Sequence, residues 1–194
     1  MINNRLNGRR IILASGSPRR RYLLKELGLD FETCSTNVRE DYPQGLTPVA
    51  IALFLARLKA DAFDSSRLDQ HAIVITADTL VSLEGEILGK PRNYSEAANM
   101  LQKLSGRKHE VITAVCLKSK EQMKVFHVLS TVLFKTLTQE EIDYYIDNFK
   151  PFDKAGGYGV QEWIGYIGIR KIEGSFFNVM GLPVKELYEE LLKF

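Results

Sequence analysis

Near its N-terminus the chain reads IILASGSPRRRYLLKELG over residues 11–28. The apolar start predicts a short buried strand, and Ser17 followed by Pro18 is typical of a helix N-cap and of the first helical position. Gly28 is placed to end that helix. A strand, a turn of small residues and a helix N-terminus in this order bring free backbone N–H groups and a partial positive charge together, which suits a bound anion.

Three consecutive arginines, Arg19–Arg21, occupy the first turn of this predicted helix. Because acidic residues are favoured at that end of a helix, a segment selected only for helix stability would not carry them. A bound polyphosphate explains the arginines, and a solvated basic turn is the alternative. The net charge of the chain is only +2, so a general binder of polyanions such as nucleic acid is not indicated.

The composition is that of an ordinary globular domain, with 194 residues, 45% of them hydrophobic and 26% charged. Cys34 and Cys116 each lie in an apolar, strand-like run, which predicts reduced core residues and neither a disulfide framework nor a zinc site. The sequence shows no signal peptide and no apolar segment long enough to cross a bilayer, so we expect a cytoplasmic protein without membrane contact.

Strands and helices alternate along the rest of the chain. We predict strands at 31–34, 72–75, 80–83, 87–88, 111–115, 125–133 and 167–172. We also predict a hairpin turn at Glu84-Gly85 and a loop at 174–183 that leads into the last helix. We predict helices at 48–63, from a cap at Asn93 or Ser95 to Leu104, from Thr138 to 149, and at 184–192. This alternation predicts the α/β class, and the late hairpins indicate a mixed sheet.

Asp78 is the strongest single candidate for chemistry. It stands in the segment 76–79, which we expect to end one apolar strand before the next begins at Leu80. A carboxylate at such a place is costly to bury unless it is paired or bound to a metal. A catalytic or metal-binding aspartate is therefore predicted, and a hydrogen-bonded structural turn is the alternative.

Two lysines and a glycine-rich segment are less specific. Lys59 lies late in its predicted helix, where the helix dipole alone favours a cation. Lys90 stands between a glycine and a proline, which suits either a lysine facing phosphate or a solvated one. Residues 151–159 are rich in glycine, as expected of a close backbone approach to a ligand or of a tight turn. This segment contains an ion pair in sequence, Asp153-Lys154, and Gln161 follows it at the start of the next predicted strand.

Several segments together resemble the Maf family of nucleotide pyrophosphatases, and they occur in the family's order. They are residues 15–20 with 23–24, Glu40, 59–60, 77–79, 89–91, 104–106, 153–156 with 158–161, and 179–183. The resemblance implies a single domain over residues 1–194. It implies a mixed, strongly twisted central sheet flanked by helices, with two lobes around a substrate cleft, as in inosine triphosphatase. It also implies hydrolysis of a nucleoside triphosphate to the monophosphate and pyrophosphate with Mg²⁺ or Mn²⁺.

The resemblance also assigns roles to residues. The phosphates would be held by Ser15, Gly16, Ser17, Arg19 and Arg20. The charge of the triphosphate would be neutralised by Lys59 and Lys90. Glu40 and Asp78 would hold the metal or activate the attacking water, since hard cations take carboxylate oxygens together with substrate phosphates. The family favours Asp78 as the proton acceptor.

Within the family, one subgroup acts on dTTP and UTP and another prefers 7-methyl-GTP. The first is marked by three residues that this chain retains, Arg20, Thr79 and Gln161. A glutamine amide matches the carbonyl and N–H pattern of a pyrimidine edge, and a site built for such bonds rejects a base that leaves them unmade. We therefore expect dTTP and UTP as substrates, with 7-methyl-GTP or another modified nucleotide as the alternative.

The chain departs from the family pattern after Gln161, where many relatives have glycine and this chain has Glu162 and Trp163. Trp163 is predicted to pack in the core and not to stack on a base. If Glu162 lined the cleft, its charge would weaken the binding of an anionic substrate.

The alternative from another functional class is a non-enzymatic regulator of septum formation and cell division. Such a protein would not need to retain together the four charged residues Glu40, Lys59, Asp78 and Lys90. Their presence favours catalysis. Family habit and the frequency of two-fold assemblies favour a homodimer.

Overall fold

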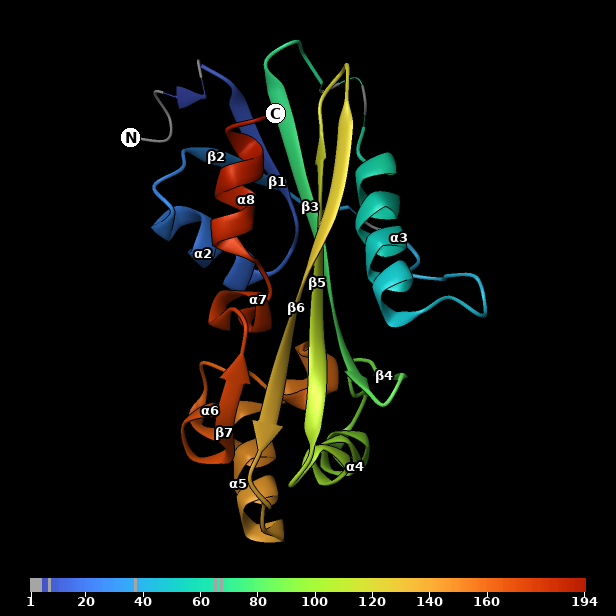
Figure 1. The fold of residues 1–194 in the computed structure, drawn as a ribbon, viewed down its shortest axis with the longest axis vertical. Coiled ribbons are helices and arrows are strands. Elements are labelled where there is room, and N and C mark those ends of the chain that lie inside the picture. The colour runs from blue at the N-terminus through green and yellow to red at the C-terminus, as the bar shows by residue number, and fades with distance from the viewer. Residues whose placement is uncertain (1–4, 7, 37, 65, 67) are drawn as a thin grey trace. The chain divides into compact units, whose positions relative to one another are not determined.

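A mixed sheet runs through the computed structural model, which describes residues 5, 6, 8–36, 38–64, 66 and 68–194 (Figure 1). The strands are β1 Arg10–Ala14, β2 Phe31–Cys34, β3 Ala72–Leu83, β4 Glu86–Leu88, β5 Lys108–Lys118, β6 Met123–Phe134 and β7 Ile169–Glu173. Their order is β2-β1-β3-β5-β6-β7, with β4 paired to β3. Parallel pairs join β1 to β2 and β3, while β3–β4 and β6–β7 are antiparallel. The predicted mixed α/β class is confirmed.

The described helices are α2 Pro18–Glu26, α3 Pro48–Asp61, α4 Tyr94–Leu104, α5 Gln139–Phe149, α6 Trp163–Gly168, α7 Phe176–Met180 and α8 Val184–Leu191, with short 3₁₀ turns at Pro151–Asp153 and Ala155–Gly157. Three of them, α2, α4 and α5, begin at the capping residues that the sequence predicts. Ser17 and Asn93 each accept a backbone N–H at a helix start, and Thr138 forms a capping box with Glu141. In the described part of the chain, no helix combines the length and apolar character needed to span a membrane.

The chain divides into two compact units. The first comprises Met1–Asp78, Thr113–Val128 and Gly181–Phe194, and the second comprises Thr79–Ile112 and Leu129–Met180. Within the first unit, α2 and α8 lie on one side of β1 and β3, and α3 lies on the other (Figure 1). The strand residues Ile12, Val74 and Ile75 are therefore completely buried, as expected of parallel strands that helices cover on both faces.

The second unit has its own apolar core. Three strands turn the same face toward α4 and α5, and the residues involved are Val81, Leu83, Val111, Val132 and Phe134 from the strands, Ala97, Leu101 and Leu104 from α4, and Ile142, Tyr145 and Ile146 from α5. The residues on α4 and on α5 recur at spacings of three and four, which is the spacing of one helix face. This core supports the segment 151–168, which carries part of the predicted site.

The two cysteines are free thiols, as predicted. Burial raises the pKa of the Cys116 thiol to about 11, and nearby Asp61 adds to the effect. Cys34 is half-buried and packs against the first unit's apolar core. The environment of Cys116 does not activate a thiolate, because a reactive cysteine needs a lowered pKa.

His109 is a buried histidine on β5 and provides a test of the second unit's core. Its side chain is packed against Phe134, its Nε2 lies 2.7 Å from the Tyr158 hydroxyl, and the residue is 2% exposed. Burial lowers the pKa of His109 from 6.5 to about 4. Between these two values the unfolded chain binds a proton that the folded chain does not, so acidification favours unfolding.

We therefore expect the free energy of unfolding to fall by about 2 kcal/mol between pH 7 and pH 5 through His109 alone. Urea unfolding of the wild type and of His109→Gln at both pH values measures this contribution as the difference between the two pH dependences. The matched control is His127→Gln, since His127 is exposed on β6. Equal pH dependence in the wild type and His109→Gln would contradict the assignment.

Three sequence predictions of secondary structure are wrong. The segment 76–79 does not interrupt a strand, because β3 is continuous from Ala72 to Leu83. Gln161 does not precede a strand directly, since α6 intervenes and β7 begins only at Ile169. The predicted loop 174–183 contains α7. In α6 the buried residues Ile164 and Gly168 are four apart, which is a helical spacing. The isoleucines at 167, 169 and 172 instead favoured a strand that begins at 167.

Candidate active site

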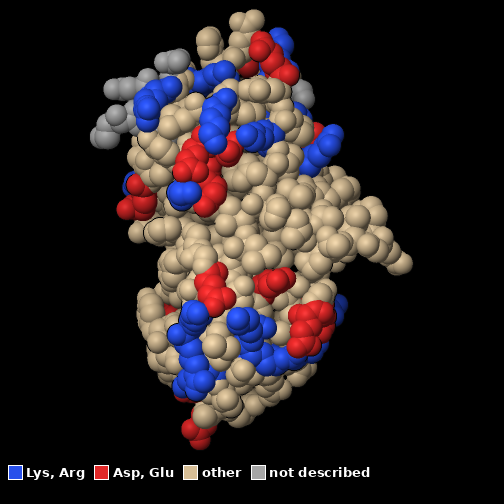
Figure 2. Space-filling view, in the orientation of Figure 1, with Lys and Arg blue, Asp and Glu red and all other residues tan. Residues whose placement is uncertain are grey.

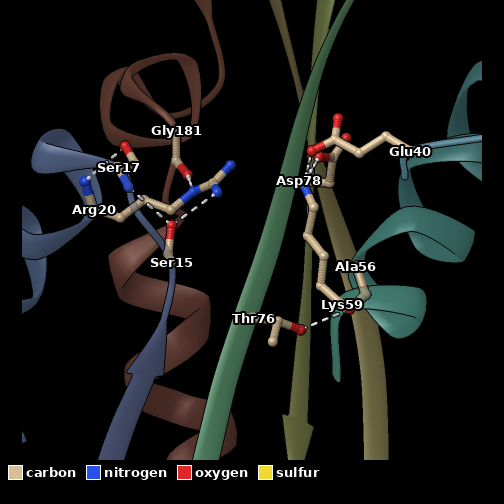
Figure 3. Close-up of polar contacts among 9 residues, drawn as sticks. All are labelled: Ser15, Ser17, Arg20, Glu40, Ala56, Lys59, Thr76, Asp78 and Gly181. Carbon is tan, nitrogen blue, oxygen red and sulfur yellow. Dashed lines mark hydrogen bonds and ion pairs between the residues drawn. The ribbon is translucent and has the colours of Figure 1, made fainter. Parts of the chain in front are cut away.

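The turn between β1 and α2 is held by its own side chains (Figure 3). Ser17 caps α2 by accepting the Arg20 backbone N–H, and its own N–H donates to Ser15 Oγ at 3.2 Å. The Arg20 guanidinium donates through Nη1 to Ser15 Oγ at 3.3 Å and through Nε to the Gly181 carbonyl at 2.9 Å. The turn and Arg20 are thus preorganised, and Gly181, just before α8, is part of the arrangement.

Both predicted carboxylates act on the pKa of Arg20. Burial is the main cause that lowers the pKa of Arg20, and the neighbouring Arg19 acts in the same direction. Asp78 and Glu40 oppose this shift. Arg20 remains a cation, since its ordinary pKa lies far above neutrality. The arginine turn and the carboxylates therefore belong to one electrostatic site within the first unit.

Lys59 joins the two carboxylates. Its Nζ lies 2.5 Å from Asp78 Oδ1 and 2.9 Å from Glu40 Oε1 (Figure 3). The side chains of Asp78 and Lys59 are 8% and 13% exposed, whereas that of Glu40 is 44% exposed. An ammonium group between two carboxylates is well compensated, which explains why β3 can carry a charge without interruption.

The pairing follows from the periodicities of a strand and a helix. Thr76 and Asp78 are two residues apart on β3 and therefore share a face. Ala56 and Lys59 are three apart on α3 and also share a face. Thr76 donates its hydroxyl to the Ala56 carbonyl at 2.6 Å. Two residues further along β3 and three further along α3, Lys59 donates to Asp78. The Thr76 bond thus sets the register that places the lysine on the aspartate.

The carboxylates fit the divalent metal that the family resemblance implies. Asp78 Oδ2 is buried and has no hydrogen-bond partner among the described residues, which is costly unless another group binds there. The same part of the chain contains no group of three or more His, Cys, Asp or Glu residues able to hold a metal ion. Two carboxylates match Mg²⁺, which usually takes one or two carboxylates together with water and substrate phosphates.

The predicted site residues divide between the units. Eight lie in the first unit: Ser15, Gly16, Ser17, Arg19, Arg20, Glu40, Lys59 and Asp78. Thr79, Lys90 and Gln161 lie in the second. Lys90 is exposed, and the segment that carries it is held through its neighbour Gly89, whose carbonyl accepts the Gly156 N–H at 3.0 Å. That the two sets meet around one substrate stays a prediction.

The two residues after Gln161 contact other residues of the second unit. The carboxylate of Glu162 is paired with Lys154 at 3.1 Å and also accepts the Tyr145 hydroxyl. Its charge is therefore compensated within the second unit. Trp163 packs against the core of that unit with its ring centroid 4.7 Å from that of Tyr144, which confirms the predicted packing role.

Sequence reasoning missed two kinds of contact. The Gly181 carbonyl that holds Arg20 is a backbone group, so its role has no side-chain signature, although Gly181 stands in one of the family-like segments. The partners of Glu162, which are Tyr145 and Lys154, lie eight or more positions before it in the sequence. The only signal in the sequence was the ion pair expected within Asp153-Lys154, which the structure contains at 2.7 Å.

Acidic and basic side chains alternate on the face of the molecule drawn in Figure 2. Exposed ion pairs of the described residues include Arg107 with Glu84 and Lys103 with Glu86. This distribution agrees with the low net charge of the chain. The expectation that the protein binds no nucleic acid stays a prediction.

Comparisons with known proteins agree with these motifs. The family described as Maf-like protein matches residues 10–194. A relative from Porphyromonas gingivalis named dTTP/UTP pyrophosphatase is 50% identical over 196 residues, covering 100% of this chain and 98% of its own. A relative of the same name from Bacteroides thetaiotaomicron is 49% identical over 194 residues and covers 100% of both chains. The solved Ham1 protein of Staphylococcus aureus is 18% identical, with a TM-score of 0.45 over 65% of this chain and 72% of its own.

Proposed function

Because the chain belongs to the Maf family, we propose that it is a nucleoside triphosphate pyrophosphatase that hydrolyses dTTP and UTP. The products are the nucleoside monophosphate and pyrophosphate. The relatives named dTTP/UTP pyrophosphatase align with the whole chain and are identical to it at about half of the aligned positions. This similarity supports the substrate class. The observation that carries the proposal is the Glu40–Lys59–Asp78 cluster in the same unit as the arginine turn.

The arginine turn binds the phosphates. Ser15 and Arg20 are held in place before substrate arrives, so little conformational entropy is lost on binding. The N-terminus of α2 adds its backbone N–H groups and partial positive charge. Lys90, supplied by the second unit, neutralises a further part of the triphosphate charge. This division of labour is expected for phosphoryl chemistry, in which positioning and charge stabilisation supply most of the rate enhancement.

Asp78 is the proton acceptor. Lys59 holds Oδ1, so Oδ2 is the oxygen that accepts a proton from the attacking water. The water oxygen forms a bond to the α-phosphorus, and the bond from that phosphorus to the α–β bridging oxygen breaks. Pyrophosphate leaves with the electron pair of the broken bond. With Asp78 as the base, Glu40 is the carboxylate that would hold Mg²⁺ or Mn²⁺, and the opposite division of the two roles is the alternative. The metal, when bound, would neutralise phosphate charge and favour ionisation of water.

Gln161 and Thr79 select the base. The Gln161 side-chain oxygen is buried and has no partner among the described residues, so a donor on the substrate would complete its hydrogen bonding. The N3–H of thymine or uracil is such a donor, and cytosine lacks it. A site with this acceptor rejects bases that leave it unpaired.

A panel of nucleotides tests this function. Purified protein with Mg²⁺ or Mn²⁺ is offered dTTP, UTP, CTP, GTP and 7-methyl-GTP, and pyrophosphate is resolved from orthophosphate. We expect pyrophosphate with dTMP or UMP. A preference for 7-methyl-GTP would overturn the role of Arg20, Thr79 and Gln161. No turnover of any nucleotide by folded protein with either metal would favour the non-enzymatic regulator. We expect the enzyme in the cytoplasm, and as a homodimer.

A further inference from the structure

A buried ion pair holds the chain next to Gln161. Glu162 Oε1 lies 3.1 Å from Lys154 Nζ, and Glu162 Oε2 accepts the hydroxyl of Tyr145. The side chains of Lys154 and Glu162 are 9% and 20% exposed. Burial and the Glu162 carboxylate raise the pKa of Tyr145, so its hydroxyl stays protonated and remains the donor. All three residues belong to the second unit.

The same tyrosine also holds the start of the turn. The Gly159 N–H donates to the Tyr145 hydroxyl oxygen at 2.9 Å, and the Glu162 N–H donates to the Gly159 carbonyl at 3.0 Å. The carbonyl of Gln161 accepts the Tyr166 hydroxyl at 2.7 Å. Hydrogen bonds thus hold the backbone of the 159–162 turn at Gly159, Gln161 and Glu162.

The side chains of Gln161 and Glu162 share one surface. A Cβ atom on Gly159 would lie 2.7 Å from Glu162 Cδ and 3.1 Å from Gln161 Nε2. Both side chains therefore pack over the bare backbone of Gly159. If the Glu162 carboxyl group moved, the amide of Gln161 would lose a neighbour that limits its position. A hydrogen-bonding group that selects a base must be held closely, because small misplacement weakens discrimination.

We propose that Glu162 is a positioning residue which, through Tyr145 and Lys154, fixes the Gln161 amide for recognition of the pyrimidine base. The proposal rests on the proposed function, because it concerns the base-selecting part of that site. Since Lys154 compensates its charge, this glutamate adds rigidity without opposing an anionic substrate.

Two substitutions remove the contacts of Glu162 with Lys154 and Tyr145, one in part and the other completely. Glu162→Gln has one acceptor oxygen and can satisfy Tyr145 or Lys154 but not both, whereas Glu162→Ala satisfies neither. We expect KM for dTTP to rise about tenfold in Glu162→Ala and less in Glu162→Gln, with little change in kcat. We expect the ratio of kcat/KM for dTTP over CTP to fall in the same order.

Tripolyphosphate serves as a probe without a base. As a competitive inhibitor it reports on the phosphate-binding residues and not on recognition of the base, and its inhibition constant is expected to be the same in the wild type and both variants. The matched control is Asp153→Asn, which removes the exposed carboxylate that also pairs with Lys154 and should leave base selectivity unchanged. Thermal unfolding verifies that the variants are folded.

Four results would overturn the proposal: unchanged selectivity in Glu162→Ala, loss of kcat without a change in KM, a parallel rise of KM and of the tripolyphosphate inhibition constant, or an equal selectivity loss in Asp153→Asn. Failure of the proposed function is distinguishable, because the wild-type protein would then release no pyrophosphate from dTTP or UTP.

Discussion

Replacing Asp78 with asparagine is expected to lower kcat for dTTP about 10³-fold while the protein stays folded. Asparagine has the shape of aspartate, and its amide oxygen can still accept from Lys59 at the position of Oδ1. It cannot accept the proton of the attacking water.

The measurement is steady-state release of pyrophosphate from dTTP by Asp78→Asn. The matched control is Asp61→Asn, which removes the half-exposed aspartate at the end of α3 that pairs with Arg57 and Lys118. That control should keep wild-type kcat. Near-wild-type turnover in Asp78→Asn would contradict the role of Asp78, whereas a folded protein with residual turnover near background supports it.

Replacing Lys59 with methionine is expected to act on both stability and turnover. The change leaves the buried Asp78 carboxylate beside Glu40 without the cation that now lies between them. Breaking such a pair should lower the free energy of unfolding by about 3 kcal/mol. Loss of a positioned cation at the phosphates should lower kcat about 100-fold.

Urea unfolding and steady-state kinetics measure the two effects of Lys59→Met separately. Lys59→Arg is the control, because it keeps the charge while changing its geometry, and should retain most of the stability. The loss of stability in Lys59→Met should become smaller when Mg²⁺ or Mn²⁺ is added, since a cation held by the carboxylates replaces the missing ammonium. Wild-type kcat in Lys59→Met would show that the lysine is only structural.

Helix starts and tight turns were predicted correctly where a short sequence pattern is typical of one local structure. A serine followed by a proline, as at Ser17 and Pro18, predicts the start of a helix, and α2 begins there. The capping box at Thr138 likewise predicts the start of α5. At Glu84-Gly85 both residues have positive φ, which matches the predicted hairpin turn. These features depend on neighbours in sequence and needed no knowledge of tertiary contacts.

The errors arose where a distant partner changes what a residue costs. Asp78 looked like the end of a strand because an isolated carboxylate is expensive to bury. Lys59 removes that cost from nineteen positions away, and β3 continues. Similarly, the sequence did not reveal that the Glu162 carboxylate is paired with Lys154 and accepts the Tyr145 hydroxyl. The residue types of the site were therefore predictable, but their pairing was not.

Hydrolysis of dTTP in water that carries a heavy oxygen isotope tests the central claim most directly. If Asp78 activates a water that attacks the α-phosphorus, the isotope enters dTMP, and the pyrophosphate released contains none. Mass spectrometry of both products after a single turnover reads this outcome. Isotope in pyrophosphate, or release of orthophosphate in its place, would contradict the account.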